Sequence, residues 1–190
     1  QADAIITSGG VSVGEADFTK TMMKQLGDVA FWRIAMRPGR PMAVGRISGI
    51  KMASSQRGMV TDSYQIDSIN IGRPAILFGL PGNPVAVMVT FLAFVRPALL
   101  RMMGARPEPP VLLRAQSSQA IPKKPGRTEY QRGIVSTQPD GRLRVCTTGN
   151  QGSGVLSSMV QANGLIVLGH AQGDVAVGDE VSVMMFEGVL

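Results

Sequence analysis

The sequence has very little cysteine, histidine or aromatic character. Its one cysteine, Cys146, cannot form an internal disulfide, which favours a reducing, cytoplasmic compartment. Cys146 lies in an alternating strand-like run, so we interpret it as a buried structural thiol. The one histidine, His170, follows another such run, and we assign it no role. Aromatic residues make up 5% of the chain, which leaves no stacking platform, so nucleic-acid binding is not expected.

No uninterrupted apolar run reaches membrane-spanning length. The longest, residues 85–100, is broken by Arg96 and Pro97. We therefore expect a soluble globular protein of 190 residues, without a membrane segment or a signal peptide. The chain begins with Gln1 inside a strand-like pattern, so we interpret it as a piece of a longer protein.

Positive charge is concentrated in the first half. The net charge is +6, and residues 1–107 contain twelve Lys or Arg against six Asp or Glu, whereas residues 108–190 contain seven of each. This distribution favours a local anion site over a nucleic-acid surface, although solvated arginine loops are the simpler explanation.

The Pro-rich stretch from Gly104 to Pro110 predicts a linker. Strand-like and helix-like runs alternate before it, which predicts an α/β domain over residues 1–107. Short β-like runs separated by turn residues follow it, which predicts a small all-β barrel-like domain over residues 108–190. The five expected strands are residues 112–115, 130–136, 143–147, 165–168 and 181–185.

The α/β half has recognisable local patterns. A helix is expected over residues 17–26, with Gly27 at its C-cap, followed by a strand over 29–36. Residues 37–41 predict a turn into a returning strand at 42–44. Residues 48–73 predict a long loop or weak hairpin.

Residues 75–84 join a strand-like run to a long helix-like run from Val85 to Met103. Asn83 fits the helix N-cap, and Pro84 fits the first helical position, where its missing N–H has no partner to lose. The free N–H groups of such a helix start bind anions.

A similar strand-to-loop pattern occurs near the beginning of the chain. Gly9 and Gly10 directly follow the run 4–8, and their small size lets backbone N–H groups approach a phosphate. Glu15 and Asp17 follow, and two carboxylates there could hold Mg²⁺. On local sequence alone, an N-cap role for Asp17 is equally good.

Three arginines lie within eight residues: Arg33, Arg37 and Arg40. Converging guanidinium groups would bind oxyanions through paired hydrogen bonds. The alternative is a solvent-facing hairpin edge.

Four segments together resemble the molybdopterin molybdotransferases, the family of MoeA and the gephyrin E-domain. They are Thr7–Lys20, Arg37–Pro41, Gly79–Pro84 and Pro125–Gly133. They follow the family's order, and the resemblance covers nearly the whole chain. It implies a partial MogA-like molybdopterin-binding α/β domain followed by the β domain.

The resemblance also implies a reaction, in which adenylylated molybdopterin and molybdate give the molybdenum cofactor and AMP with Mg²⁺. By resemblance, the site residues fall into three groups. The carboxylates for catalysis and metal are Asp17 and Glu15. The nucleotide and substrate would contact Ser8, Gly9, Gly10, Gly14 and Lys20. Molybdate and phosphate would contact Arg33, Arg37, Arg40, Pro81, Gly82, Asn83 and Pro84.

The chain also departs from the family. Lys often stands where Arg37 and Arg40 are, Ser often stands where Ala86 is, and residues 49–74 are longer than the usual hairpin. The family's earlier domains are missing, so we expect this piece alone to be inactive. The family implies a homodimer and a possible molybdopterin adenylyltransferase partner. A related adenylyltransferase and a non-catalytic molybdopterin-binding scaffold are the alternative functions.

Overall fold

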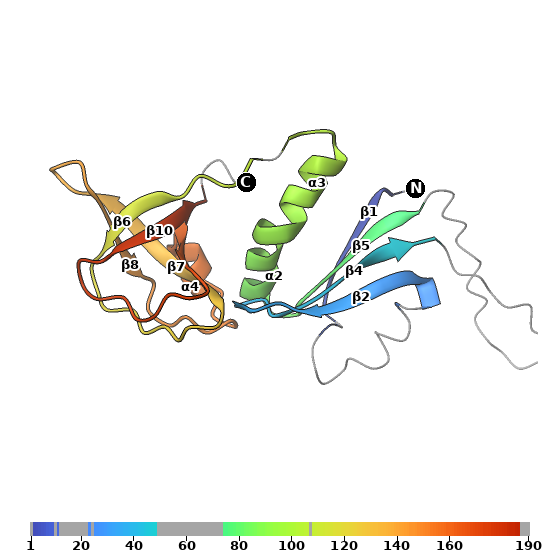
Figure 1. Ribbon diagram of the computed structural model, residues 1–190, viewed down its shortest axis with the longest axis horizontal. Coiled ribbons are helices and arrows are strands. Elements are labelled where there is room, and N and C mark those ends of the chain that lie inside the picture. Colours follow the sequence, from blue (N-terminus) through green and yellow to red (C-terminus); the bar gives the residue numbers. More distant parts are fainter. Residues whose placement is uncertain are drawn as a thin grey trace, which may run out of the picture.

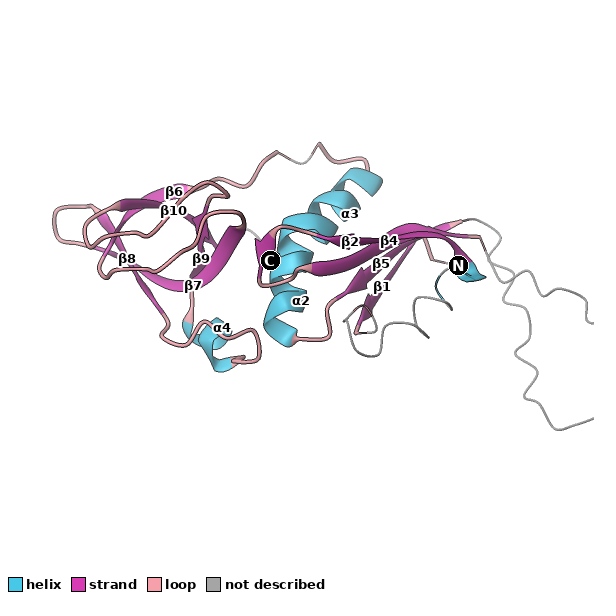
Figure 2. Ribbon diagram, turned by 60° about the horizontal axis from the view of Figure 1, so that its bottom comes forward, coloured by secondary structure: helices cyan, strands magenta, loops and turns pink. Residues whose placement is uncertain are grey.

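The computed structural model describes residues 2–9, 11, 23, 25–48, 74–106 and 108–186. Within these ranges the chain forms a four-stranded α/β sheet and a closed β-barrel, with one long helix standing between them (Figure 1). The same arrangement is visible from a second direction (Figure 2). The α/β fold followed by a small barrel is therefore confirmed.

The α/β sheet has the strand order β1-β5-β4-β2. Strand β5 (Ala75–Leu80) is central and buried along most of its length, as its apolar sequence predicts. Strand β1 (Ala4–Ser8) pairs with it in parallel, and β4 (Pro41–Ile47) pairs with it antiparallel. Strand β2 (Gly27–Arg33) forms the other edge, antiparallel to β4.

The predicted long helix is confirmed. It runs as α2 (Pro84–Thr90), a π-helical turn η1 (Phe91–Val95) and α3 (Arg96–Met102). The Arg96 N–H donates to the Phe91 carbonyl, five residues back, directly before Pro97, which has no N–H. The π turn thus carries the helix past a proline that would otherwise interrupt it.

By length and composition alone, Pro84–Met102 could cross a membrane, and 28% of its most apolar window is buried. Its buried side chains contact both units. Val95 packs with Met42 and Phe78 of the sheet, whereas Val85 and Val89 pack with Met159 and Leu165 of the barrel unit. The helix therefore joins the two units through a shared apolar core.

The barrel consists of five strands that close on themselves in the order β7-β8-β6-β10-β9 and back to β7. Closure leaves no free sheet edge within this ring. The core contains Val145, Ile166, Leu168 and Val183, all fully buried. The strands are β6 (Leu113–Ser117), β7 (Thr128–Thr137), β8 (Leu143–Thr147), β9 (Gly164–Leu168) and β10 (Glu180–Met185). All five predicted strands are confirmed.

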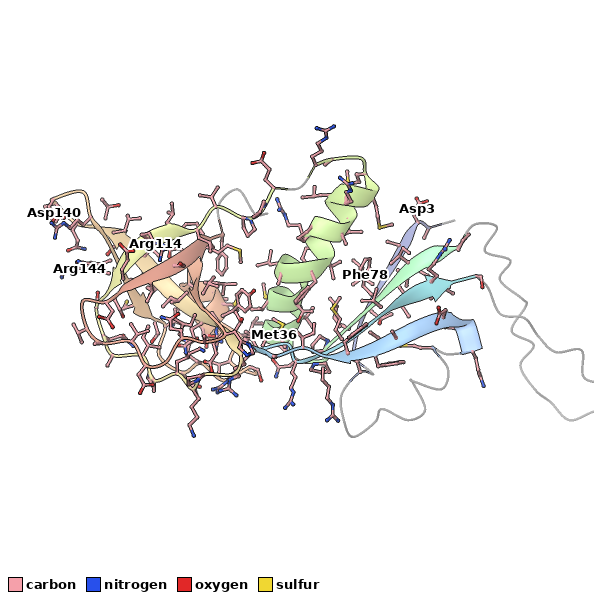
Figure 3. All side chains as sticks on the ribbon, viewed as in Figure 1. Asp3, Met36, Phe78, Arg114, Asp140 and Arg144 are labelled. Atoms are coloured by element: carbon pink, nitrogen blue, oxygen red, sulfur yellow. The ribbon has the colours of Figure 1, made fainter. Side chains whose placement is uncertain are left out.

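Two elements were not predicted. The short helix α4 (Ser157–Gln161) precedes β9. Strand β3 (Met36–Arg37) pairs in parallel with β7, so two residues from before the linker belong to the barrel's sheet. Met36 consequently lies where the two units meet (Figure 3).

Several local predictions need correction. Gly27 follows helical residues, but it is the first residue of β2 and lacks the positive φ of a helix C-cap glycine. Cys146 on β8 is half-buried, with its Sγ 3.9 Å from the Ile134 carbonyl oxygen, so it is not a fully buried thiol. Most of the predicted helix 17–26 and of the loop 48–73 lies outside the described residues.

Candidate functional site: an anion cavity between the two units

The loop that carries Arg37 and Arg40 is tightly held from behind. The Ile34 N–H donates to the Arg40 carbonyl at 2.8 Å, which closes the segment between β2 and β4. Gly39 has φ of +96°, and a Cβ at this position would collide with Thr90 Oγ1 of α2. Only glycine fits both constraints. The two arginine side chains are exposed.

The start of α2 forms a second wall of the site. Asn83 is its N-cap and Pro84 its first residue, as predicted, and the Val87 N–H donates to the Asn83 carbonyl at 2.8 Å. The Asn83 side chain does not cap the helix, and its Oδ1 is buried without a hydrogen-bond partner. No described side chain therefore caps the start of α2, and its unpaired first-turn N–H groups suit an anion.

The barrel supplies the third wall, a glycine-rich loop at residues 149–154. Arg132, 1% exposed, holds this loop. Its Nε donates to Ser158 Oγ at 2.9 Å, and its Nη2 donates to the carbonyls of Gly152 at 3.0 Å and Asn150 at 3.3 Å. The Gln151 side chain makes two hydrogen bonds to the Arg132 backbone. Its Oε1 accepts from the Arg132 N–H at 2.7 Å, and its Nε2 donates to the Arg132 carbonyl at 3.2 Å.

These three walls enclose a cavity of about 280 Å³. Among the described residues, two guanidinium groups and no carboxylate line it, so this part of its lining suits an anion. The presence of Ser153 adds a hydroxyl near the arginines. The lining residues are Arg37, Pro38, Gly39, Arg40, Pro41, Pro81, Asn83, Ala86, Gln151 and Ser153.

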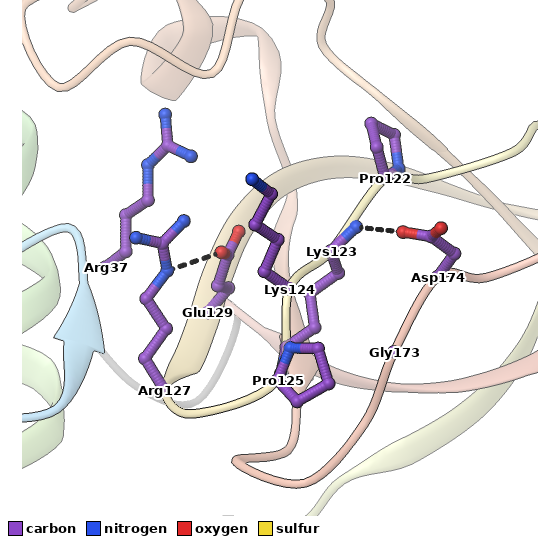
Figure 4. A pocket seen from close by; sticks show the side chains of 9 residues that line it. All are labelled: Arg37, Pro122, Lys123, Lys124, Pro125, Arg127, Glu129, Gly173 and Asp174. Atoms are coloured by element: carbon purple, nitrogen blue, oxygen red, sulfur yellow. Dashed lines mark hydrogen bonds and ion pairs between the residues drawn. The ribbon is translucent and has the colours of Figure 1, made fainter.

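A larger neighbouring cavity, about 590 Å³, also includes Arg37 in its lining. Arg37, Lys124, Arg127 and Glu129 all line it, and Figure 4 shows Arg127 bonded to the Glu129 carboxylate. Arg127 Nε is 2.7 Å from Glu129 Oε1, so that cation is already paired. Arg37 and Lys124 have no ion-pair partner among the described residues.

Arg37 also influences the buried Arg132. Burial lowers the pKa of the Arg132 guanidinium, and the positive charge of Arg37 lowers it further. No acidic partner compensates Arg132 among the described residues. An anion in the cavity would reduce the repulsion between these two cations.

The structure brings together part of the predicted site. Arg37, Arg40, Pro81 and Asn83 line the 280 Å³ cavity, whereas Gly82, Pro84 and Arg33 are not among its lining residues. Arg33 ends β2, whereas Arg37 belongs to the barrel's sheet, so the two arginines lie on different strands.

Gly9, at the start of the predicted phosphate loop, lies next to Gly82 in the loop after β5. The Gly9 N–H donates to the Leu80 carbonyl at 3.0 Å, and Gly9 has φ of +92°. The loops after β1 and β5 are therefore neighbours. The remaining predicted loop residues, Gly10, Gly14, Glu15, Asp17 and Lys20, lie outside the described residues. In the part of the chain that the structure describes, no three His, Cys, Asp or Glu residues gather into a metal site.

Sequence reasoning missed Gln151, Ser153 and Arg132 as members of the site. The available signal was the run Gly149–Gly154 after a predicted strand, which holds three glycines and three small or amide polar residues. Arg132 lies in the segment Pro125–Gly133 that resembles the family, but the burial of an arginine cannot be inferred from its neighbours in sequence.

Two family profiles match the chain. The family described as a probable molybdopterin binding domain matches residues 1–101. The MoeA C-terminal region (domain IV) matches residues 114–186. Together they cover both units and leave the linker between them.

Individual proteins agree with these matches. The chain is 36% identical over 191 residues to a molybdopterin molybdenumtransferase of Haemophilus influenzae, covering 100% of this chain and 41% of that protein. It is 32% identical over 193 residues to gephyrin of Dictyostelium discoideum, covering 97% of this chain and 26% of gephyrin. The chain thus spans less than half the length of these relatives.

Solved structures show the same fold. A molybdopterin biosynthesis moea protein from Pyrococcus horikosii superimposes with a TM-score of 0.65 and 25% identity, over 98% of this chain and 38% of that one. A molybdenum cofactor biosynthesis protein from Pyrococcus furiosus gives 0.59 and 24% identity, over 96% and 49%.

Proposed function

The chain belongs to the MoeA family of molybdopterin molybdenumtransferases, which act in molybdenum cofactor biosynthesis, and we propose that it is part of such an enzyme. In the proposed reaction, the enzyme inserts molybdate into adenylylated molybdopterin and releases AMP with Mg²⁺. The chain covers 41% of the Haemophilus relative, so the proposal concerns the protein at its full length.

The observation that carries the proposal is the cavity between the two units. Arg37 and Arg40 face the uncapped start of α2, and Ser153 reaches the same cavity from the barrel. Molybdate and phosphate are both oxyanions, and guanidinium groups with backbone N–H donors are suited to them.

Arg37 and Arg40 would hold molybdate or the pterin phosphate, with Pro81–Pro84 closing the site beside them. The nucleotide would lie along the loop after β1, against Ser8, Gly9, Gly10, Gly14 and Lys20. Asp17 and Glu15 would hold Mg²⁺, whose charge would stabilise the phosphate groups when bound. Arg33 is proposed as a more distant contributor to the positive field.

AMP release by the full-length protein tests the function. With adenylylated molybdopterin, molybdate and saturating Mg²⁺, we expect AMP to appear and Asp17→Asn to slow its appearance strongly. Asn is also a good N-cap, so loss of capping should change stability by only a few tenths of a kcal/mol. A mutant that releases AMP at nearly the unmutated rate would remove Asp17 from the chemistry.

The same measurement separates the alternatives. A non-catalytic scaffold would bind the substrates without releasing AMP. A molybdopterin adenylyltransferase would form the adenylylated compound, but the match of residues 114–186 to the MoeA C-terminal region favours the molybdotransferase. We further propose a cytoplasmic homodimer that receives its substrate from such an adenylyltransferase, and that residues 1–190 alone are inactive.

A further inference from the structure

We propose that the barrel recognises the pterin ring of the substrate in a cavity beside Arg37, lined by Gln119, Gln131 and Thr147. The proposal rests on the function proposed above. It places the heterocycle against the barrel, although the family match described as molybdopterin binding covers residues 1–101.

The cavity has a volume of about 310 Å³, at the lower end of the range for small-molecule sites. Among the described residues, its lining contains three glutamines, one threonine and one cation, and no carboxylate. Such a lining suits a neutral ligand that both donates and accepts hydrogen bonds. The residues are Arg37, Gln119, Ala120, Ile121, Pro122, Gln131, Thr147, Gly149 and Gln151.

Two consecutive hydrogen bonds, from Arg127 to Glu129 and from Gln131 to Glu129, fix the orientation of the Gln131 amide. Arg127 Nε lies 2.7 Å from Glu129 Oε1, and Gln131 Nε2 donates to Glu129 Oε2 at 3.1 Å. An ionised carboxylate only accepts, so the amide nitrogen of Gln131 must face Glu129. Its Oε1 has no partner among the described residues and remains an acceptor in a side chain only 8% exposed.

Gln119 and Thr147 supply the complementary groups. Gln119 Nε2 donates to Thr147 Oγ1 at 2.8 Å. Within the described ranges, the Gln119 Oε1 is left to accept and the Thr147 hydroxyl hydrogen to donate. Gln151 differs, because both ends of its amide are already used on Arg132. It forms a wall of the cavity and offers no free amide group.

A pterin carries a 2-amino-4-oxopyrimidine edge, which presents two N–H donors next to a carbonyl acceptor. The Oε1 atoms of Gln131 and Gln119 match the donors, and Thr147 or Arg37 matches the carbonyl. Arg37 also lines the 280 Å³ anion cavity. A heterocycle with an attached phosphate would therefore place its ring in one cavity and its anion in the other.

Titration of the full-length protein with neopterin, followed by the intrinsic fluorescence of the pterin, tests this site. Loss of one neutral hydrogen bond in Gln131→Met should weaken binding about three- to tenfold. Thr147→Val should weaken it similarly and tests the opposite wall of the cavity. Gln138→Met is the matched control, because Gln138 lines a separate cavity at the far end of the barrel, and it should bind normally.

Competing ligands identify the recognised edge. Guanosine carries the same 2-amino-4-oxopyrimidine edge and should displace neopterin, whereas adenosine lacks it and should not. Equal displacement by adenosine overturns the proposal. So does unchanged neopterin affinity in both Gln131→Met and Thr147→Val, with circular dichroism showing both variants folded.

If Gln131→Met fails to fold, the neopterin titration of Thr147→Val alone tests the pterin site, and unchanged affinity in that variant overturns the proposal. The two proposals also fail separately. AMP release that depends on Arg37, without any neopterin binding, overturns only the pterin site. Neopterin binding that depends on Gln131, without AMP release, supports the pterin site and rejects the proposed reaction.

Discussion

The arginines that the α/β unit places at the cavity are exposed, whereas three charged side chains that the barrel places near it are buried. Arg37 and Arg40 have no ion-pair partner among the described residues. Lys123, Glu129 and Arg132 of the barrel are 3%, 3% and 1% exposed. The α/β unit thus exposes its two cavity arginines, whereas the barrel buries two cations, Lys123 and Arg132, although its Arg114 and Arg142 remain exposed.

The buried charges of the barrel are used in holding loops. Lys123 Nζ donates to the carbonyls of Gly169 at 2.6 Å, Gln172 at 2.7 Å and His170 at 3.3 Å. Arg132 does the same for residues 150–152. The comparison indicates that the exposed arginines are available to a ligand, whereas the buried cations determine where the loops around that ligand lie.

The largest effect on stability is expected from Arg132→Met. The substitution keeps much of the side-chain volume but leaves Ser158 Oγ and the carbonyls of Asn150 and Gly152 without their donor. Relief of the buried charge offsets part of this loss, so we expect a decrease of about 3 kcal/mol in the free energy of unfolding. Chemical denaturation followed by circular dichroism measures it.

Arg142→Met is the control for Arg132→Met, because Arg142 makes only an exposed contact with Asp140 at 3.6 Å. It should change the free energy of unfolding by less than about 0.5 kcal/mol. Equal stability of the two variants would contradict a supporting role for the buried arginine.

Arg37→Ala, unlike Arg132→Met, should weaken anion binding and leave stability unchanged. Arg37 lines three cavities and has no partner to lose, so its removal should leave the fold intact. Loss of a charge-assisted contact should weaken molybdate or sulfate binding by about 1.5–3 kcal/mol, or ten- to a hundredfold. Calorimetric titration of the full-length protein measures the affinity.

Arg114→Ala is the matched control for the titration. Arg114 lies on β6, where it is exposed and 3.7 Å from Glu180. Its removal changes the net charge by the same amount as Arg37→Ala does, so it should leave molybdate affinity unchanged. Similar losses in the two variants would mean that diffuse charge, not a site, attracts the anion.

Local signals predicted most of the fold. The five barrel strands followed from turn residues between short β-like runs, and the long helix followed from Asn83, Pro84 and an apolar run. The pairing of Met36–Arg37 with β7 could not be predicted in this way, because it joins residues about ninety positions apart. The cavity shows the same limit: its α/β walls were predicted from motifs, whereas Ser153 reaches it only through the tertiary fold.

Gly39→Ala tests how firmly the arginine loop is held. Alanine would have to adopt the positive φ of Gly39, and its methyl group would collide with Thr90 Oγ1. We therefore expect the free energy of unfolding to fall by about 1–2 kcal/mol. Because the loop carries Arg37 and Arg40, molybdate affinity should fall with it. Gly141→Ala also has a positive φ of +81° but open space around it, so it should show the strain alone and leave molybdate binding unchanged.

The smallest effect is expected from Arg37→Lys, and it separates charge from shape. Lysine keeps the positive charge but loses the planar pair of donors that fits an oxyanion. We expect molybdate affinity to fall about two- to fivefold, or about 0.5–1 kcal/mol, and stability to stay unchanged. Arg37→Gln, which keeps hydrogen-bond donors without the charge, should approach the loss seen for Arg37→Ala. If lysine is as poor as alanine, the fixed guanidinium geometry dominates the site. If glutamine binds as well as arginine, the excess positive charge of the α/β unit contributes nothing at this position.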